Sequence, residues 1–182
     1  MLGWKRFTEL TVDKLIRLGR SARIVVDRGA YDQEVSLGGE IVELDASQTL
    51  TLRRHSGGKT LLLKGTGAAK TYVLPKATGS GARLRFIVGE VNTSSHIIKV
   101  ADAVDVLRGN IHTNSTADSP DLAQPWPTSS TSDTITLNGT TTGGQAVGDI
   151  IELTDIAPGI WQVIGFTTSS GTEATPFSAT VS

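Results

Sequence analysis

The sequence predicts an all-β fold: an antiparallel β-sandwich, jelly-roll-like domain or barrel, preceded by an extended N-terminal arm. Glycine, threonine and serine are abundant, with 20, 24 and 16 copies in 182 residues, as expected for strands joined by turns. Short runs that alternate apolar and polar residues recur between Gly, Pro and Ser/Thr clusters. No helical pattern is long enough to connect parallel strands, so an α/β sheet is not expected.

The arm comes first and covers residues 1–22. Its apolar residues form a poor helical stripe, and at most one short helix is expected, beginning after Thr11 and ending at Gly19. An isolated helix of this length is marginal in water. We therefore interpret the arm as a segment that becomes ordered against another surface.

The rest of the chain, residues 23–182, is interpreted as a single β-domain. Its expected strands are short runs bounded by turn-forming residues, and most have a period of two. They are residues 22–26, 40–44, 48–53, 60–63, 72–74, 83–88, 96–100, 133–138, 149–153 and 160–166. Short strands at this spacing favour an antiparallel sandwich or a barrel.

One Ser/Thr/Pro-rich segment, residues 112–132, interrupts this rhythm. The segments on either side contain too few strands to close a core alone, so we interpret it as a long loop inside the domain and not as a linker. Pro125 and Pro127 fix the backbone around Trp126, which makes this tryptophan a candidate exposed contact. The alternative is that Trp126 covers the edge of the core.

Composition excludes several classes of function. The chain has no cysteine, so disulfides, a thiol nucleophile and a cysteine zinc site are excluded. Its formal charge of −1 gives no indication of nucleic-acid binding. The longest aliphatic runs, 24–26 and 61–63, are far shorter than the ~20 residues that cross a bilayer, so no membrane partner is expected. No secretory signal is expected at the start either.

Charge is distributed unevenly along the chain. Residues 1–30 hold seven basic and three acidic groups, whereas residues 110–182 hold seven acidic groups and no Lys or Arg. Such a gradient suggests two ends that meet different surroundings. The alternative is compositional drift with an acidic, solvated face.

The motifs that would indicate catalysis or a cofactor fail on spacing. Residues 65–71 invite comparison with a phosphate loop, but Lys64 and Ala69 stand where that loop needs glycine. A strand ended by Pro75 follows, where the loop needs a helix N-terminus. Gly79-Ser80-Gly81 holds its glycines too close for a nucleophile elbow. We expect no enzyme activity and no cofactor.

The titratable residues do not indicate a metal site either. The histidines His55, His96 and His112 have no paired spacing, and we expect each at the surface or at a sheet edge. Four aspartates lack the alternate acidic spacing of a calcium loop and are better interpreted as a solvated acidic face: Asp102, Asp105, Asp118 and Asp121.

Six tracts of the β-domain carry a resemblance to a known class of protein. They are TYVLPKATGSGARLRF (71–86), SDTITLN (132–138), TTTGG (140–144), GDIIEL (148–153), GIWQV (159–163) and SGTEATPF (170–177). Together they resemble small virion structural proteins of tailed bacteriophages, over about residues 40–182. The resemblance implies a non-enzymatic capsid decoration, or cement, protein. Such proteins are usually homotrimers on the capsid exterior, where they bind the major capsid protein at capsomer junctions.

A rival interpretation from another class is a tail or fibre β-module that binds host-surface polysaccharide. In that case Trp126, Trp161 and Tyr72 would stack on sugars. Trp161 is better interpreted as a core residue, because it alternates with Ile160 and Gln162 in an expected strand. A depolymerase is a third choice and would need a carboxylate pair that the sequence does not locate.

The arm supplies the capsid-binding residues in the first interpretation. Apolar anchors without a core to enter lie beside unpaired basic groups, a combination suited to a neighbouring acidic surface, and Trp and Arg are enriched at binding hot spots. These residues are Trp4, Lys5, Arg6, Phe7, Leu10, Lys14, Arg17 and Arg20. The alternative is that the arm completes the trimer by swapping onto a neighbouring subunit.

Removal of residues 1–22 separates these two roles. If the arm is the tether, the truncated protein should remain a folded trimer in light scattering but lose affinity for undecorated heads. Replacing Arg17 and Arg20 by alanine should give a smaller loss that fades as salt rises, because exposed charges are screened. Dissociation of the truncated protein into monomers would support swapping. Saturation of heads at an unchanged concentration would contradict the tether.

Overall fold

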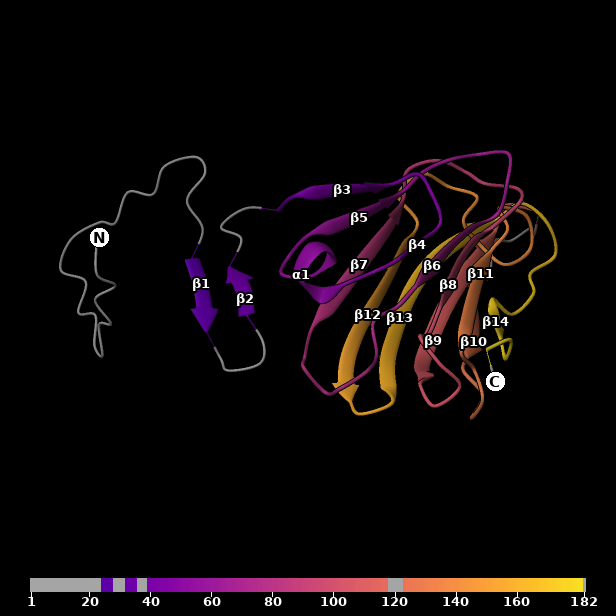
Figure 1. Cartoon of the computed structure of the whole chain (residues 1–182). Coiled ribbons are helices and arrows are strands. Elements are labelled where there is room, and N and C mark those ends of the chain that lie inside the picture. Colours follow the sequence, from indigo (N-terminus) through magenta and orange to yellow (C-terminus); the bar gives the residue numbers. More distant parts are fainter. Residues whose placement is uncertain (1–23, 28–31, 36–38, 118–122, 182) are drawn as a thin grey trace, which may run out of the picture.

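The computed structural model describes residues 24–27, 32–35, 39–117 and 123–181, and in these ranges the chain forms mixed β-sheets packed as a sandwich (Figure 1). The predicted all-β class is confirmed, and of the three architectures considered the sandwich is the one observed. Residues 1–22, with the short helix expected there, lie outside the described residues.

The larger sheet has seven strands and the smaller has five. In their order across the larger sheet, the strands are β10 (Ala123–Pro127), β9 (Val106–Ser115), β13 (Ile160–Ser169), β12 (Ile150–Ala157), β7 (Arg83–Val88), β5 (Thr60–Leu63) and β3 (Ile41–Leu44). In the smaller sheet they are β14 (Phe177–Ser178), β11 (Thr134–Leu137), β8 (His96–Lys99), β6 (Lys70–Val73) and β4 (Gln48–Thr49). A separate antiparallel hairpin consists of β1 (Ile24–Asp27) and β2 (Asp32–Val35).

The chain alternates between the two sheets as it leaves β3. As a result β3, β5 and β7 run parallel in the larger sheet, and β4, β6 and β8 run parallel in the smaller one. Parallel strands need a long connection, which here contains a strand of the opposite sheet in place of a helix. The predicted antiparallel arrangement is therefore wrong for these strands and for the parallel pair of β9 and β13. The other strand pairs are antiparallel.

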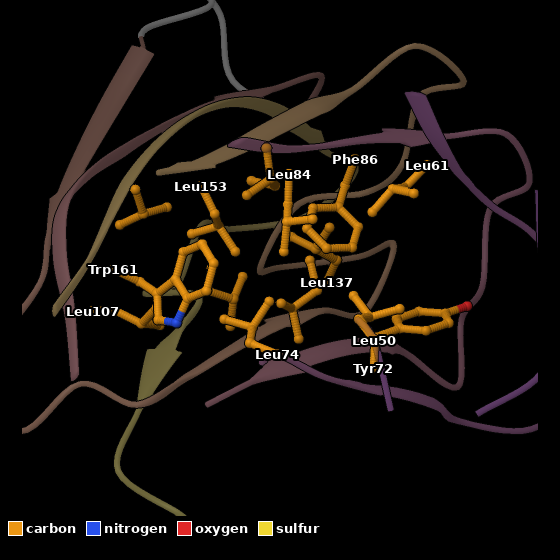
Figure 2. Close-up of a cluster of buried hydrophobic side chains, with 14 of the residues drawn as sticks. Leu50, Leu61, Tyr72, Leu74, Leu84, Phe86, Leu107, Leu137, Leu153 and Trp161 are labelled. Carbon is orange, nitrogen blue, oxygen red and sulfur yellow. The ribbon is translucent and has the colours of Figure 1, made fainter. Parts of the chain in front are cut away.

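One hydrophobic cluster fills the space between the sheets (Figure 2). Inward and outward positions alternate along each strand, as in β13, where Trp161 and Val163 are buried and Gln162 is exposed. Trp161, Tyr72 and Phe86 are the largest of the fully buried side chains. The expectation that Trp161 belongs to the core is confirmed.

The two buried aromatic residues with polar atoms also fix the loops beside them. The indole Nε1 of Trp161 donates a hydrogen bond to the carbonyl of Pro75 at 3.2 Å. The hydroxyl of Tyr72 donates to the carbonyl of Leu44 at 2.8 Å. Because buried donors need a partner, these bonds set where the chain leaves β3 and β6.

The predicted strand at residues 48–53 is shorter than expected. After β4, the amide of Leu50 donates to the carbonyl of Val73 at 2.8 Å, and the chain then turns into the four-residue helix α1 (Leu52–His55). The amide of Thr51 donates to Nδ1 of His55 at 3.0 Å, which closes this turn. No helix in the described ranges is long and apolar enough to cross a membrane.

The predicted loop at residues 112–132 is wrong at its start and in its middle, whereas residues 128–132 do form a loop. β9 continues through His112 to Ser115, and residues 123–127 form β10, which pairs antiparallel with β9. The sheet tolerates Pro125 and Pro127 because β10 is an edge strand, where a missing amide proton removes no ladder bond if it faces outward.

Buried aspartates hold several loops against the ends of the strands. Asp155, on β12, accepts hydrogen bonds from the amides of Thr78, Gly79 and Ser80 at 2.7 to 3.1 Å and from the hydroxyl of Ser80 at 2.7 Å. This buried carboxylate fixes the backbone of residues 78–80.

Two further aspartates act in the same way. Asp149 accepts from the amides of Gly144 at 3.0 Å and Thr168 at 2.8 Å. Asp133 accepts from the amide of Thr180 at 2.9 Å and so fixes the C-terminal segment. Of the seven acidic groups in residues 110–182, these three aspartates are buried and hydrogen-bonded to the chain, so they do not belong to a solvated face.

The expected solvated face is also wrong for Asp105. Its side chain is buried, and it accepts a hydrogen bond from the amide of Ala77 at 2.8 Å. Asp102 is partly exposed and forms an ion pair with Lys76 at 2.9 Å. Asp118 and Asp121 lie outside the described residues.

Gly109 marks the closest approach between β9 and β13. A Cβ atom at this position would lie 1.8 Å from the carbonyl oxygen of Val163. We predict that Gly109→Ala lowers the free energy of unfolding by about 3 kcal/mol or more, because the backbone of one strand must move. Urea denaturation measures the loss.

Gly148→Ala is the matched control. Gly148 also has a positive φ, +103°, but a Cβ there meets nothing within 4 Å. It should cost only about 1 kcal/mol, the backbone penalty alone. Equal losses in the two variants would contradict the close approach.

Candidate functional site

The outer face of the seven-stranded sheet carries a row of four apolar side chains that ends at a histidine. Strand register places Leu62, Ile87, Ile150, Phe166 and His112 side by side on β5, β7, β12, β13 and β9. Neighbouring strands lie about 4.8 Å apart, so the row crosses roughly 19 Å of the sheet. We call these five residues the outer row.

Phe166 is the most exposed member of the outer row, with 60% of its surface accessible. Its ring stacks on His112 at a centroid distance of 5.6 Å and an interplanar angle of 17°. Ile164, two residues earlier on β13, lies on the same face and is 48% exposed. Exposed apolar groups that lie together on a sheet face are typical of a protein-binding surface.

Polar side chains border the outer row on one side. Arg85 and Glu152, opposite each other on β7 and β12, form an ion pair at 3.3 Å, and both are about half exposed. Further along, the guanidinium of Arg108 donates to the carbonyls of Ser129 and Ser130 at 2.9 Å, so it fixes the segment after β10. An apolar centre beside a polar rim is the usual arrangement of an interface.

The buried ionisable groups serve the fold. His96 lies in the core, where its ring stacks on Tyr72 and its Nε2 donates to the carbonyl of Glu90 at 3.0 Å. Burial lowers the pKa of His96, against the opposing effect of that hydrogen bond. Burial likewise lowers the pKa of His55. The expectation that His55 and His96 lie at the surface or a sheet edge is therefore wrong; His112 is half-buried on the outer face.

The buried aspartates have different proton affinities. Burial raises the pKa of Asp149 despite its hydrogen bonds, and burial also raises the pKa of Asp105. For Asp155, burial acts in the same direction, but hydrogen bonds from Ser80, Gly79 and Thr78 outweigh it and lower the pKa.

The described titratable groups do not cluster as metal ligands. No group of three or more metal-ligating side chains occurs in the part of the chain that the structure describes.

The site residues expected from the sequence fall into two sets. Trp4, Lys5, Arg6, Phe7, Leu10, Lys14, Arg17 and Arg20 lie outside the described residues. Trp126 is half-buried on β10 and packs against the core. This matches the alternative interpretation, in which Trp126 covers the edge of the core. Tyr72 and Trp161 are fully buried, so neither is available to stack on a sugar.

Sequence reasoning missed the outer row, although the strands carried a signal for it. The expected strand at 160–166 has apolar residues on both of its faces. Trp161 and Val163 face inward, and Ile164 and Phe166 face outward. Apolar side chains on both faces indicate a strand that is covered on both sides. Outward apolar residues of different strands form one row only if the strands pair in the right register. The sequence of a single strand does not reveal that register.

Comparison with known proteins gives no match: no family model fits the chain, and no curated protein is similar to it.

The lowered pKa values of His55 and His96 predict acid sensitivity. Between pH 7 and pH 5 the unfolded chain binds protons at these histidines before the folded chain does, so stability is complete above the unfolded pKa and falls as pH decreases. Each unit of pKa depression corresponds to about 1.4 kcal/mol. The raised pKa values of Asp105 and Asp149 act in the opposite direction. The variant His96→Gln removes the contribution of one of these two histidines to the pH dependence of stability.

Urea denaturation from pH 7 to pH 5 should therefore show a smaller loss of stability for His96→Gln than for the wild type. Asp102→Asn is the control, because the pKa of Asp102 is lowered by its bond to Lys76 and its effect falls at more acidic pH. This control should keep the wild-type slope. An unchanged slope in His96→Gln would contradict the role of the buried imidazole.

Proposed function

We propose that this protein is a non-enzymatic virion structural protein of a tailed bacteriophage. Its proposed role is that of a capsid decoration protein, bound as a homotrimer to the major capsid protein on the exterior of the head. The resemblance of six tracts to virion proteins of tailed bacteriophages supports the assignment to a phage particle. The outer row is the observation that carries the binding role, because it offers apolar contact on a rigid sheet.

The rigidity of the domain suits a protein that holds a shell together. Buried aspartates fasten the loops at the strand ends, and one cluster joins the two sheets. Little order then has to be gained on binding, which reduces the entropic cost of association. A trimer presents three such surfaces on one body, and avidity can exceed single-site affinity by roughly 10² to 10⁴. A protein that binds only the assembled shell stabilises it by mass action.

A tail or fibre module that binds host polysaccharide is the second candidate. The stacked pair of Phe166 and His112 is the observation that favours it, because sugars stack on exposed rings. The burial of Tyr72 and Trp161 removes two of the three aromatic residues on which this candidate first rested. Labelled protein should appear over the head under the first proposal and on the tail under the second.

Phe166→Asp tests the outer row as a binding surface. We expect affinity for undecorated heads to fall at least tenfold, because a charge replaces the most exposed apolar group of the row. The free energy of unfolding should change by less than about 1 kcal/mol, since the side chain is largely in solvent. A head-binding titration and urea denaturation measure the two effects.

Val104→Asp is the matched control, because Val104 is 71% exposed and lies in the loop before β9, eight residues before the outer-row residue His112. It should bind heads as the wild type does. Full affinity in Phe166→Asp would remove the outer row from the proposal. If Phe166→Asp loses binding to host polysaccharide but still binds heads, the result supports the tail or fibre module.

A further inference from the structure

The seven-stranded sheet ends at β3, and this edge has backbone groups without a strand partner. The carbonyl of Leu44 accepts a hydrogen bond from the amide of Lys64, at the end of β5, at 3.0 Å. Since every second residue of a parallel strand faces its neighbour, the N–H and C=O groups of Ile41 and Glu43 point away from β5. Within the described residues, these four groups have no hydrogen bond to another strand.

The opposite edge of the same sheet is protected. The amide of Thr128 donates to the carbonyl of Gly109 at 3.0 Å, and this register turns the backbone nitrogens of Pro125 and Pro127 away from β9. Proline has no N–H, so the outward side of β10 lacks two donors that an added strand would need. The edge strands of the smaller sheet, β4 and β14, have only two residues each.

The side chains of β3 leave its edge accessible. Glu40 pairs with Lys59 at 3.0 Å and Glu43 pairs with Lys64 at 3.3 Å, so both carboxylates are held toward the β5 side. Ile41 is 64% exposed. β3 contains no proline that would remove a donor, as β10 does.

The hairpin of β1 and β2 also lacks a neighbouring strand among the described residues. It forms a sheet of two strands that joins neither of the large sheets, although only residues 36–40 separate β2 from β3. An isolated two-stranded hairpin is marginally stable in water. The sequence of β1 begins Ile24-Val25-Val26, and β-branched residues favour strands. Among the described residues of one chain, the hairpin and the β3 edge each lack a further strand partner.

We propose that the β3 edge of one copy binds the β1–β2 hairpin of a second copy by strand addition. Each edge offers two N–H donors and two C=O acceptors to the added strand, and each hairpin offers β1 as that strand. The contact is head-to-tail, so it closes into a ring when each copy both gives a hairpin and receives one. This inference concerns association of the chain with itself and does not rest on the capsid role.

Glu43→Pro tests the edge. Proline removes an outward-facing N–H and no bond between β3 and β5, so the sandwich should fold as before. Sedimentation equilibrium of the full chain should show a dissociation constant for self-association at least tenfold higher than in the wild type. Glu43→Ala is the matched control: it loses the same contact with Lys64 but keeps the N–H, and it should associate as the wild type does.

A second variant tests the hairpin. The double substitution Val25→Pro/Val26→Pro removes a donor on each side of β1, while Val25→Thr/Val26→Thr keeps both donors and the β-branched shape. Because β1 belongs to neither large sheet, the proline pair cannot break a ladder bond of the sandwich. It should raise the dissociation constant at least tenfold as well, and the threonine pair should not.

A mixture of the two proline variants gives the sharpest result. Glu43→Pro has an intact hairpin, and the Val25/Val26 variant has an intact edge. At a concentration where each variant alone is monomeric, the two together should form a one-to-one pair that does not grow further. A wild-type chain that is monomeric at its highest soluble concentration would overturn the proposal, since the hairpin would then have no partner in a second copy. So would association that is unchanged in the hairpin variant, or a mixture in which no pair forms.

Discussion

The two sheets bury their inner faces against each other, and Trp161, Phe86 and Tyr72 are the largest of the side chains fully buried between them (Figure 2). The chain crosses from one sheet to the other repeatedly, so each crossing loop must be fastened at the rim of this core. The indole of Trp161 and the hydroxyl of Tyr72 donate hydrogen bonds to loop carbonyls. The carboxylate of Asp155 accepts hydrogen bonds from three consecutive backbone amides. The interior therefore fixes the loops as well as the sheets.

This arrangement commits several buried polar side chains to backbone contacts. The carboxylates of Asp133, Asp149 and Asp155 are bound to backbone amides, and the imidazole of His96 is bound within the core. What the larger sheet offers outward is the outer row on one face and the backbone of β3 at one edge. Under the two proposals, both are surfaces for contact with other polypeptides. A structural protein that binds through several copies needs both kinds of contact, one to its support and one to itself.

Sequence alone predicted the class of fold well and its connections poorly. The strands at 60–63 and 83–88 were expected with their observed bounds, because their patterns are strong and turns flank them. β9 was missed because Gly109 and Asn110 weaken its strand pattern, although Gly109 is what permits the approach to β13. The burial of Asp155 could not be foreseen either, since its amide partners lie 75 to 77 residues away in the chain. The outer row needed the register of five strands, and the arm residues proposed for capsid binding stay a prediction.

The proposed function requires that this domain bind a phage head through the outer face of its larger sheet. An electron cryomicroscopy reconstruction of the assembled particle tests it most directly. We predict density for the sandwich on the exterior of the head at the junctions between capsomers, with β13 and Phe166 directed at the major capsid protein. Density for this protein on the tail, or on the head with the outer face of β13 turned to solvent, would contradict the claim.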